Sequence, residues 1–335
     1  MGKAKISKIV TLWSFASEHE KLMHGQVATA TLYDQMRAIR MLMAHIGENI
    51  RLMNISPRHA ESFISARLAS KVRIPTVNKD IRMLKRVFNL AIEPRGYLLP
   101  GQNPFAKIRQ RRISLKPPRY ISPETVRTLL LLASNTWWKT MIALAYSSAG
   151  RRDELLNLTW ADINFDKQTV RFSPKESSSM LLTWEPKDHE SRLVPIPAEV
   201  VQLIADLQTE ADGESPYVFI SGARLTRILS QRENGTWKPN LDLVNNITRN
   251  LKVICWRAGV EKFTLHDLRR SCITNWAEVL PMHVVQKLAG HSDIKTTQQY
   301  YLSVRECDLH KARQLQSDLL RTDTTDPKLT HFSPK

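Results

Sequence analysis

Apolar residues recur every three or four positions along the first third of the chain, which is the spacing of amphipathic helices. One such face is made by Leu32, Met36, Ile39, Met43 and Ile46. Ser56 before Pro57 is typical of a helix start, with serine as the capping residue and proline at the first helical position. A further helix is predicted from about Val77 to Ile92. The pattern predicts a helical N-terminal part.

The remaining two thirds mix two periods. Helices are predicted from Ser122-Pro123 to about Ala133 and over 138–149. Alternating, β-rich patterns follow at Thr169–Phe172, Leu181–Trp184 and Arg192–Ile196. Helices resume near 198–211, 241–258, 264–278, 281–289 and 293–301, and an apolar stripe predicts another over 302–320. The expected fold class is mainly α with a small β-sheet (α+β).

Composition suggests where the two parts join. Residues 94–120 contain five prolines and two glycines, which favours a linker. We therefore expect a helical domain at 1–93, a basic Pro-rich linker at 94–120, a second domain at 121–321 and a flexible polar tail at 322–335.

Positive charge is concentrated near the N-terminus. Residues 1–117 carry 21 Lys and Arg against 7 Asp and Glu, a net of +14, whereas 118–335 have a net of +3. A solvated helix surface is the ordinary explanation of a charged face, but this excess favours nucleic acid as the partner. The expected DNA contacts are Lys79, Arg82, Lys85 and Arg86 on the helix, and Arg109, Arg111 and Arg112 in the linker.

Other classes of protein fit the chain poorly. The three cysteines form no C-x-x-C pair, which argues against a disulfide framework or a cysteine zinc site and suits a reducing cytoplasm. No apolar run approaches the length of a membrane span. Neither a Walker loop nor metal-ligand spacing of His and Cys is present, so no cofactor or metal is expected.

Three segments carry candidate chemistry. Arg151 follows a glycine at a helix junction and could point into a cleft, or it could simply pair with Glu154 three residues on. His266 and Arg269 share a helix face behind a capping-box-like start, Thr264 with Asp267.

The third segment is Leu288-Ala289-Gly290-His291, followed nine residues after its histidine by Tyr300. Gly290 is a plausible helix C-cap that would place His291 in a tight turn. Tyr301 points about 100° away from Tyr300 if both are helical. Taken alone, a tyrosine on a short helix is more often a packing residue than a nucleophile.

The order and spacing of the three segments resemble the tyrosine recombinase family, the phage-integrase type of site-specific DNA recombinase. The resemblance covers essentially the whole chain. The N-terminal third is similar to the family's helical, SAM-like core-binding domain, and the remainder to its catalytic domain.

The resemblance implies a set of catalytic residues. The two arginines of the site fall on Arg151 and Arg269, the histidines on His266 and His291, and the nucleophile on Tyr300. The family also has a lysine shortly before an Arg-x-x-Pro strand, which here is Lys187. The long stretch 173–183 offers Lys175 as a rival for that lysine. Asp153, beside Arg151, departs from the family's usual small or neutral residue.

The resemblance also implies an activity. The enzyme would cleave and rejoin duplex DNA at a specific site through a 3′-phosphotyrosyl intermediate, without metal or ATP. It would act as a homotetramer on paired sites, with accessory DNA-bending proteins as further candidate partners, in the cytoplasm at a bacterial or phage nucleoid. The expected biology is that of a mobile element or phage. The alternatives are a type IB topoisomerase-like strand cleavage and a catalytically silent DNA-binding relative.

Overall fold

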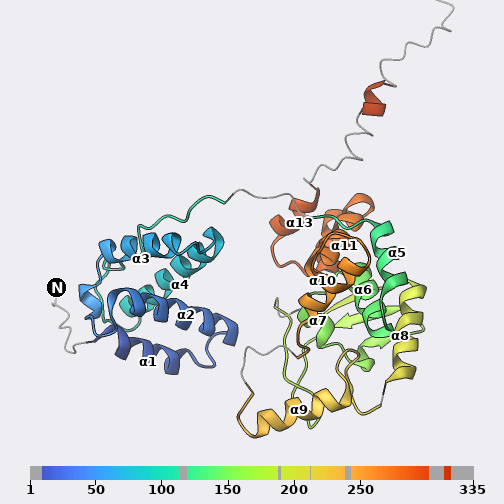
Figure 1. Cartoon of the computed structure of the whole chain (residues 1–335), viewed down its shortest axis with the longest axis horizontal. Coiled ribbons are helices and arrows are strands. Elements are labelled where there is room, and N and C mark those ends of the chain that lie inside the picture. Colours follow the sequence, from blue (N-terminus) through green and yellow to red (C-terminus); the bar gives the residue numbers. More distant parts are fainter. Residues whose placement is uncertain are drawn as a thin grey trace, which may run out of the picture. The chain divides into compact units, whose positions relative to one another are not determined.

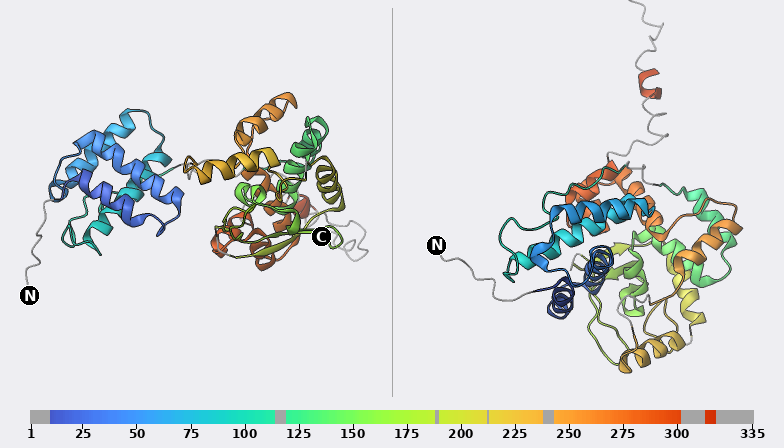
Figure 2. Two further views of the ribbon diagram at one scale, coloured as in Figure 1. Left: turned by 90° about the horizontal axis from the view of Figure 1, so that it is seen from below. Right: turned by 60° about the vertical axis from the view of Figure 1, so that its left-hand side comes forward.

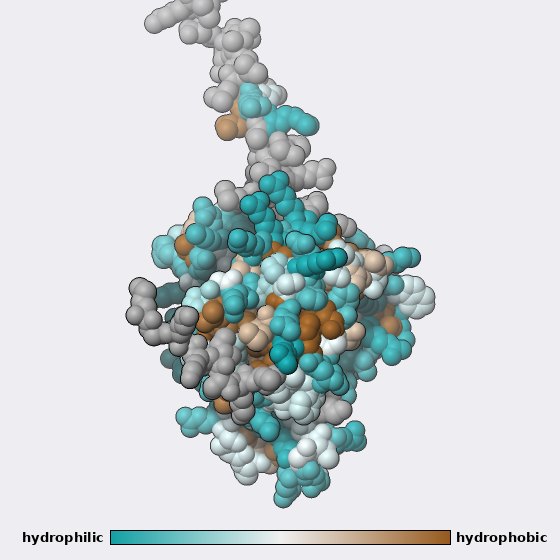
Figure 3. Space-filling model, turned by 90° about the vertical axis from the view of Figure 1, so that its left-hand side faces the viewer, coloured by the Kyte–Doolittle hydropathy of each residue, from teal (hydrophilic) through white to brown (hydrophobic). Residues whose placement is uncertain are grey.

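The computed structural model describes residues 10–113, 119–187, 190–211, 213–237, 243–301 and 313–317. The chain divides into two compact units (Figure 1): the described residues up to 113 lie in the first, and those of 119–236 and from 243 on lie in the second. Each unit has its own buried apolar core. Among the described residues, no helix is both long and apolar enough to cross a bilayer. Hydrophilic side chains cover most of the surface visible in Figure 3, with apolar ones in small patches.

The first unit is built from helices, as its pattern predicted. They are α1 (Leu12–Met23), α2 (Thr29–Ile46), a short 3-10 helix η1 (Leu52–Asn54), α3 (Pro57–Ala69) and α4 (Ile74–Ile92). Ser56 caps α3 and Pro57 occupies its first turn, which confirms that predicted start. The fourth helix begins at Ile74, three residues earlier than predicted, because Pro75 is accommodated in its first turn.

A buried carboxylate joins three helices of this unit. Asp80 of α4 has no exposed side-chain surface, and its oxygens lie 2.6 Å from Arg37 of α2 and 3.0 Å from Arg67 of α3. A buried charge is costly unless it is paired, so the two guanidiniums make this position tolerable. The cluster fixes α2 and α3 against α4.

The segment after α4 is packed, unlike the linker predicted from residue 94. Leu98 and Phe105 are buried in the core of the first unit. The Asn103 side chain donates to the backbone carbonyl of Lys85 at 2.8 Å. Asn78 exchanges two hydrogen bonds with the main chain of Arg111, at 2.8 and 2.9 Å. Residues 94–111 therefore belong to the first unit, and the predicted boundary at residue 93 is too early.

In the second unit, helices surround a small sheet (Figures 1 and 2). Its first elements are α5 (Pro123–Leu132), α6 (Thr136–Ser148), α7 (Arg152–Leu156), η2 (Trp160–Asp162), β1 (Ile163–Asn164), β2 (Thr169–Phe172) and β3 (Arg192–Pro195). The rest are α8 (Ala198–Glu210), α9 (Gly222–Glu233), α10 (Ile247–Arg257), α11 (Leu265–Val279), α12 (Met282–Ala289) and α13 (Ile294–Tyr301). The described elements confirm the α+β class.

The sheet is antiparallel in the order β1-β2-β3. Val170 faces Val194 across β2 and β3, and Phe172 faces Arg192 at the end of the pair. The strand predicted at Leu181–Trp184 is absent from the described structure. Only Trp184 pairs there, in an isolated bridge with Lys175, because the Leu182 N–H is bonded instead to the Tyr217 hydroxyl.

The predicted helix over 302–320 lies outside the described residues except for a helical turn at 313–317.

Candidate active site

Arg151 is held at a sharp junction between α6 and α7. Ala149 ends α6 in the left-handed conformation, with φ of 50°. A side chain on Gly150 would come within 2.7 Å of Leu155, so the turn requires glycine. Arg151 then caps α7, and its backbone N–H donates to the Glu154 carboxylate at 2.7 Å. Its guanidinium donates to Glu154 at 2.9 Å and to the Gly290 carbonyl at 2.7 Å.

Glu154 gathers three arginines from separate parts of the second unit. Besides Arg151, it accepts a forked pair from Arg192 of β3, with N–O distances of 2.8 and 2.5 Å. Arg269 of α11 lies 3.9 Å from the same carboxylate. The Glu154–Arg151 pairing expected as the ordinary alternative is therefore present, but as one part of a larger cluster.

The cluster controls the ionisation of its buried members. Burial acts to raise the pKa of the Glu154 carboxyl, but the hydrogen bonds and charge of Arg192, the Arg151 backbone N–H and the charge of Arg269 outweigh it and lower that pKa to about 2. Burial and the charge of Arg151 lower the pKa of Arg269 to about 10. At neutral pH the carboxylate is ionised and the Arg269 guanidinium remains protonated.

Arg269 also holds three chain segments together. Its side chain is almost fully buried and donates to the Ala149 carbonyl at the end of α6 and, at 2.7 Å, to the Ala289 carbonyl at the end of α12. Helix C-termini present unpaired carbonyls, which a cation satisfies well. The arginine thus fixes α11 against the ends of two other helices.

His291 and Tyr300 lie next to each other. Gly290 ends α12 with φ of 63°, which confirms the predicted C-cap. The turn places the His291 ring 5.9 Å from the Tyr300 ring, centroid to centroid and nearly parallel. His291 Nδ1 lies 2.9 Å from the hydroxyl oxygen of buried Thr297, which orients the imidazole.

The two adjacent tyrosines have different surroundings. The Tyr301 hydroxyl donates to the Leu280 carbonyl at 2.6 Å. Burial raises the pKa of Tyr300, while the charges of Arg269, Arg270 and Arg151 and a hydrogen bond from Arg270 act to lower it. Tyr300 therefore lies within electrostatic reach of both predicted arginines, whereas Tyr301 supports the α11–α12 corner.

His266 is positioned at the start of α11 by the predicted capping box. Thr264 and Asp267 exchange hydrogen bonds, with Asp267 accepting at 2.7 and 2.8 Å. Partial desolvation and the charges of Arg270 and Arg269 lower the pKa of His266 below 6.5. Its imidazole is consequently neutral, and able to accept a proton, at pH 7.

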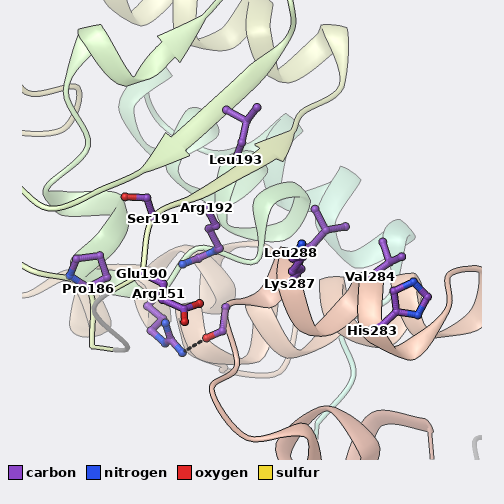
Figure 4. A pocket seen from close by; sticks show the side chains of 11 residues that line it. Arg151, Pro186, Glu190, Ser191, Arg192, Leu193, His283, Val284, Lys287 and Leu288 are labelled. Atoms are coloured by element: carbon purple, nitrogen blue, oxygen red, sulfur yellow. Dashed lines mark hydrogen bonds between the residues drawn. The ribbon is translucent and has the colours of Figure 1, made fainter.

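The two candidate lysines differ in their surroundings. Lys175 has 9% of its side chain exposed, and its ammonium lies 2.6 Å from the Asp162 carboxylate and 3.2 Å from the Ser173 hydroxyl. Lys187 is exposed at a turn. It follows Pro186, which lines a cavity of about 500 Å³ together with Arg151, Arg192 and Lys287 (Figure 4).

The predicted DNA contacts of the first unit fall into two groups. Lys79 pairs with Asp34 at 2.6 Å, Lys85 donates to the Ala106 carbonyl at 2.7 Å, and Arg82 lies 3.4 Å from Gln110. Arg82 and Lys85 are nevertheless exposed, as are the other four, Arg86, Arg109, Arg111 and Arg112.

Sequence reasoning missed the part played by Arg192, which served only as a landmark of the Arg-x-x-Pro strand, and the number of partners of Glu154. The Arg-x-x-Glu spacing of Arg151 and Glu154 signals a capping arrangement. No local pattern signals an arginine 38 residues away.

Solved structures share the fold described above. The Tn1549 transposon integrase in complex with transposon right end DNA superposes with a TM-score of 0.64 at 18% identity, covering 92% of this chain and 100% of that chain. A lambda integrase tetramer bound to a Holliday junction gives 0.60 at 15% identity, covering 88% and 78%. The architecture is that of integrase-type proteins with a helical N-terminal domain.

Sequence comparison identifies the family to which the chain belongs. Residues 119–306 match the phage integrase family, and the chain belongs to that family. The tyrosine recombinase of Thermosipho africanus is 27% identical over 301 residues, covering 87% of this chain and 92% of the relative. Tyrosine recombinase XerA of Pyrococcus furiosus is 28% identical over 249 residues, covering 72% and 75%. The chain is thus a tyrosine recombinase, an enzyme of DNA strand transfer.

Proposed function

We propose that this enzyme cleaves and rejoins duplex DNA at a specific site, with Tyr300 as the nucleophile. The observation that carries the proposal is that Arg151 and Arg269 meet at the buried Glu154 carboxylate, while Tyr300, stacked on His291, lies within electrostatic reach of both arginines. The family's name and its DNA-bound structural neighbours support the substrate class.

The chemistry follows from the residues. The Tyr300 oxygen attacks the scissile phosphorus, and the bond from phosphorus to the 5′-oxygen breaks. The phenol of Tyr300 is protonated at neutral pH, so it needs a base, and the neutral imidazole of His266 suits that role. Lys187 protonates the departing 5′-oxygen, since its competitor Lys175 is bound to Asp162.

The arginines stabilise the charge that develops on the non-bridging oxygens. Arg151 and Arg269 are guanidinium donors, with Arg269 still protonated at neutral pH, and they are held in fixed positions by Glu154 and by backbone carbonyls. His291 donates a further hydrogen bond to the same oxygens. The 3′-phosphotyrosyl link conserves the bond energy, so a 5′-hydroxyl from a second strand reverses the attack. On this mechanism the reaction needs neither ATP nor a metal ion.

The proposal includes how the enzyme assembles on DNA and where it acts. Exchanging two duplexes requires four tyrosines, and the lambda integrase neighbour is a tetramer on a Holliday junction. We therefore infer a homotetramer on paired sites, accessory DNA-bending proteins as candidate partners, and action in the cytoplasm at a bacterial or phage nucleoid. The basic residues expected to contact the DNA backbone are Lys79, Arg82, Lys85 and Arg86 on α4 and Arg109, Arg111 and Arg112 after it.

The direct test is capture of the covalent link. Host genomic fragments are incubated with the enzyme in EDTA, denatured with SDS and retained on a protein-binding filter, and sequencing of the retained ends yields the site duplex. We expect Tyr300→Phe to abolish retention without weakening native DNA binding, because only the nucleophilic oxygen is lost. The matched variant Tyr301→Phe should still form the adduct.

The outcomes separate the alternatives. Adducts of equal yield from Tyr300→Phe overturn the assignment of the nucleophile. A wild-type adduct that is religated only to its own strand, never to a second duplex, indicates topoisomerase-like activity. No adduct from the wild type on any fragment indicates a silent DNA-binding protein.

A further inference from the structure

Arg192 occupies an unusual position at the base of the connection between β2 and β3 (residues 173–191). It is the first residue of β3 and faces Phe172, the last residue of β2. Its guanidinium lies over the Phe172 ring, 4.5 Å from the centroid, and its two terminal nitrogens fork onto Glu154. Figure 4 shows the side chain reaching toward Arg151. One cation therefore contacts both ends of the connection and the arginine cluster.

The geometry is specific for arginine. The side chain is 7% exposed, so its charge must be compensated, and the carboxylate does this through two parallel bonds that only a planar guanidinium can make. Gly290 leaves room for it: a Cβ there would lie 3.0 Å from Nη1 of Arg192. The Arg192 Nε has no hydrogen-bond partner among the described residues, so the fork on Glu154 is made at the expense of that donor.

The connection that carries Lys187 has a second anchor. Lys175 is paired with Asp162, and the Leu182 backbone N–H donates to the Tyr217 hydroxyl at 2.7 Å. Leu182 is itself buried. Lys187 thus lies in a short span between this anchor and Arg192, five residues further on.

We propose that Arg192 is a positioning residue for the reaction: by joining the start of β3 to Glu154, it holds the span bearing Lys187 at the arginine cluster. The inference rests on the proposed function and goes beyond it, since it assigns Arg192 an effect on proton transfer to the leaving group. Misplacing a reacting group by about 1 Å costs on the order of 100-fold in rate.

The test compares two leaving groups on the site duplex. A normal 5′-oxygen needs a proton as it departs, whereas a 5′-bridging sulfur leaves as a thiolate without one. Arg192→Met should cut single-turnover cleavage of the oxygen substrate about 10- to 100-fold, as loss of a supporting contact does elsewhere, and cleavage of the sulfur substrate less than about 3-fold. Arg192→Lys keeps the charge beside Glu154 and should show the same preference if Arg192→Met fails to fold.

Two further variants make the result decisive. If Arg192 acts through Lys187, the double variant Arg192→Met/Lys187→Ala should cleave the oxygen substrate no more slowly than Lys187→Ala alone. The matched control is Arg171→Met, which removes an exposed arginine from the opposite face of β2 and should leave both rates unchanged.

Several outcomes would contradict the inference. Equal losses on both substrates would show that Arg192 supports the arginines or the fold rather than the lysine. An additive double variant, or no loss at all, would also overturn it. Failure of the proposed function itself is seen separately, because then either Tyr300→Phe would still form the adduct or the wild type would form none.

Discussion

Each unit of this protein buries one carboxylate among arginines, and the two clusters do different things. Asp80 pairs with Arg37 and Arg67, which project from neighbouring helices of the same bundle. Glu154 pairs with arginines that arrive from a helix cap, a strand and the interior of another helix. In the first cluster the carboxylate fixes helix packing. In the second it fixes the arginines themselves, beside a cavity and a tyrosine.

The difference lies in where each carboxylate sits in its helix. Asp80 lies inside α4, where the neighbouring backbone N–H groups are already bonded within the helix, so its side chain is left to make tertiary contacts. Glu154 is in the first turn of α7, where it accepts from the Arg151 backbone N–H as well as from side chains. A capping carboxylate can thus position the residue it caps, which here is one of the candidate catalytic arginines.

The largest expected effect is on stability, at Asp80. Replacing Asp80 with Asn leaves two arginines facing a neutral amide and should lower the free energy of unfolding of the first unit by about 3–5 kcal/mol. Amide hydrogen exchange in α2, α3 and α4 measures this directly. The cleavage rate per folded molecule should not change; a specific loss of cleavage would erase the contrast between the clusters.

The next largest effect is on the cleavage rate, and it distinguishes a variant of Arg269 from the same variant of Arg67. Arg269→Ala removes a donor to the developing charge and should slow single-turnover cleavage by about 100- to 1,000-fold, the usual cost of losing one such donor. Arg67→Ala also deletes an arginine from a buried carboxylate, but should affect stability alone. Rates are normalised to the folded fraction, measured by near-UV circular dichroism. Similar normalised losses from both variants would refute the division of roles.

The smallest expected effect is the loss of stability at acid pH when the Glu154 carboxylate is protonated. Its pKa is about 2 in the folded protein against 4.5 ordinarily, so its contribution is fully present above pH 4.5 and is lost as the pH falls toward 2. The shift corresponds to at most about 3 kcal/mol. Urea unfolding of the wild type and of Glu154→Gln between pH 5 and pH 2.5 should show a difference that shrinks with acidification. A constant difference would show that the arginines do not favour the ionised carboxyl.

Local patterns predicted most helices because capping and periodicity act within a few residues. Ser56-Pro57 and the Thr264–Asp267 box both mark helix starts in the structure. The segment after residue 93 was misassigned for the converse reason. Its prolines, glycines and charges look like a linker, and the apolar residues that bury it, Leu98 and Phe105, are too few to form a pattern.

The candidate site likewise has some features that could be predicted from the sequence and others that could not. The motif residues could be identified from their order along the chain through the family resemblance, and their catalytic roles stay predictions until tested. The pairing of Arg192 with Glu154 could not be inferred, because hydrogen bonds between distant segments leave no periodic signal. The predicted strand at Leu181–Trp184 failed similarly: its alternation was right for a strand, but a contact with distant Tyr217 occupies the backbone there.

Gly290 is a position at which amino-acid substitutions are poorly tolerated. Its left-handed backbone disfavours any L side chain, and the first carbon of such a side chain would press on the Arg192 guanidinium. Every single-base change of a glycine codon gives glycine again, a stop, or a residue that carries that carbon. The first amino-acid substitution at this position therefore already carries the full cost of backbone strain and steric contact. No single-base change replaces this glycine with a residue that avoids that cost.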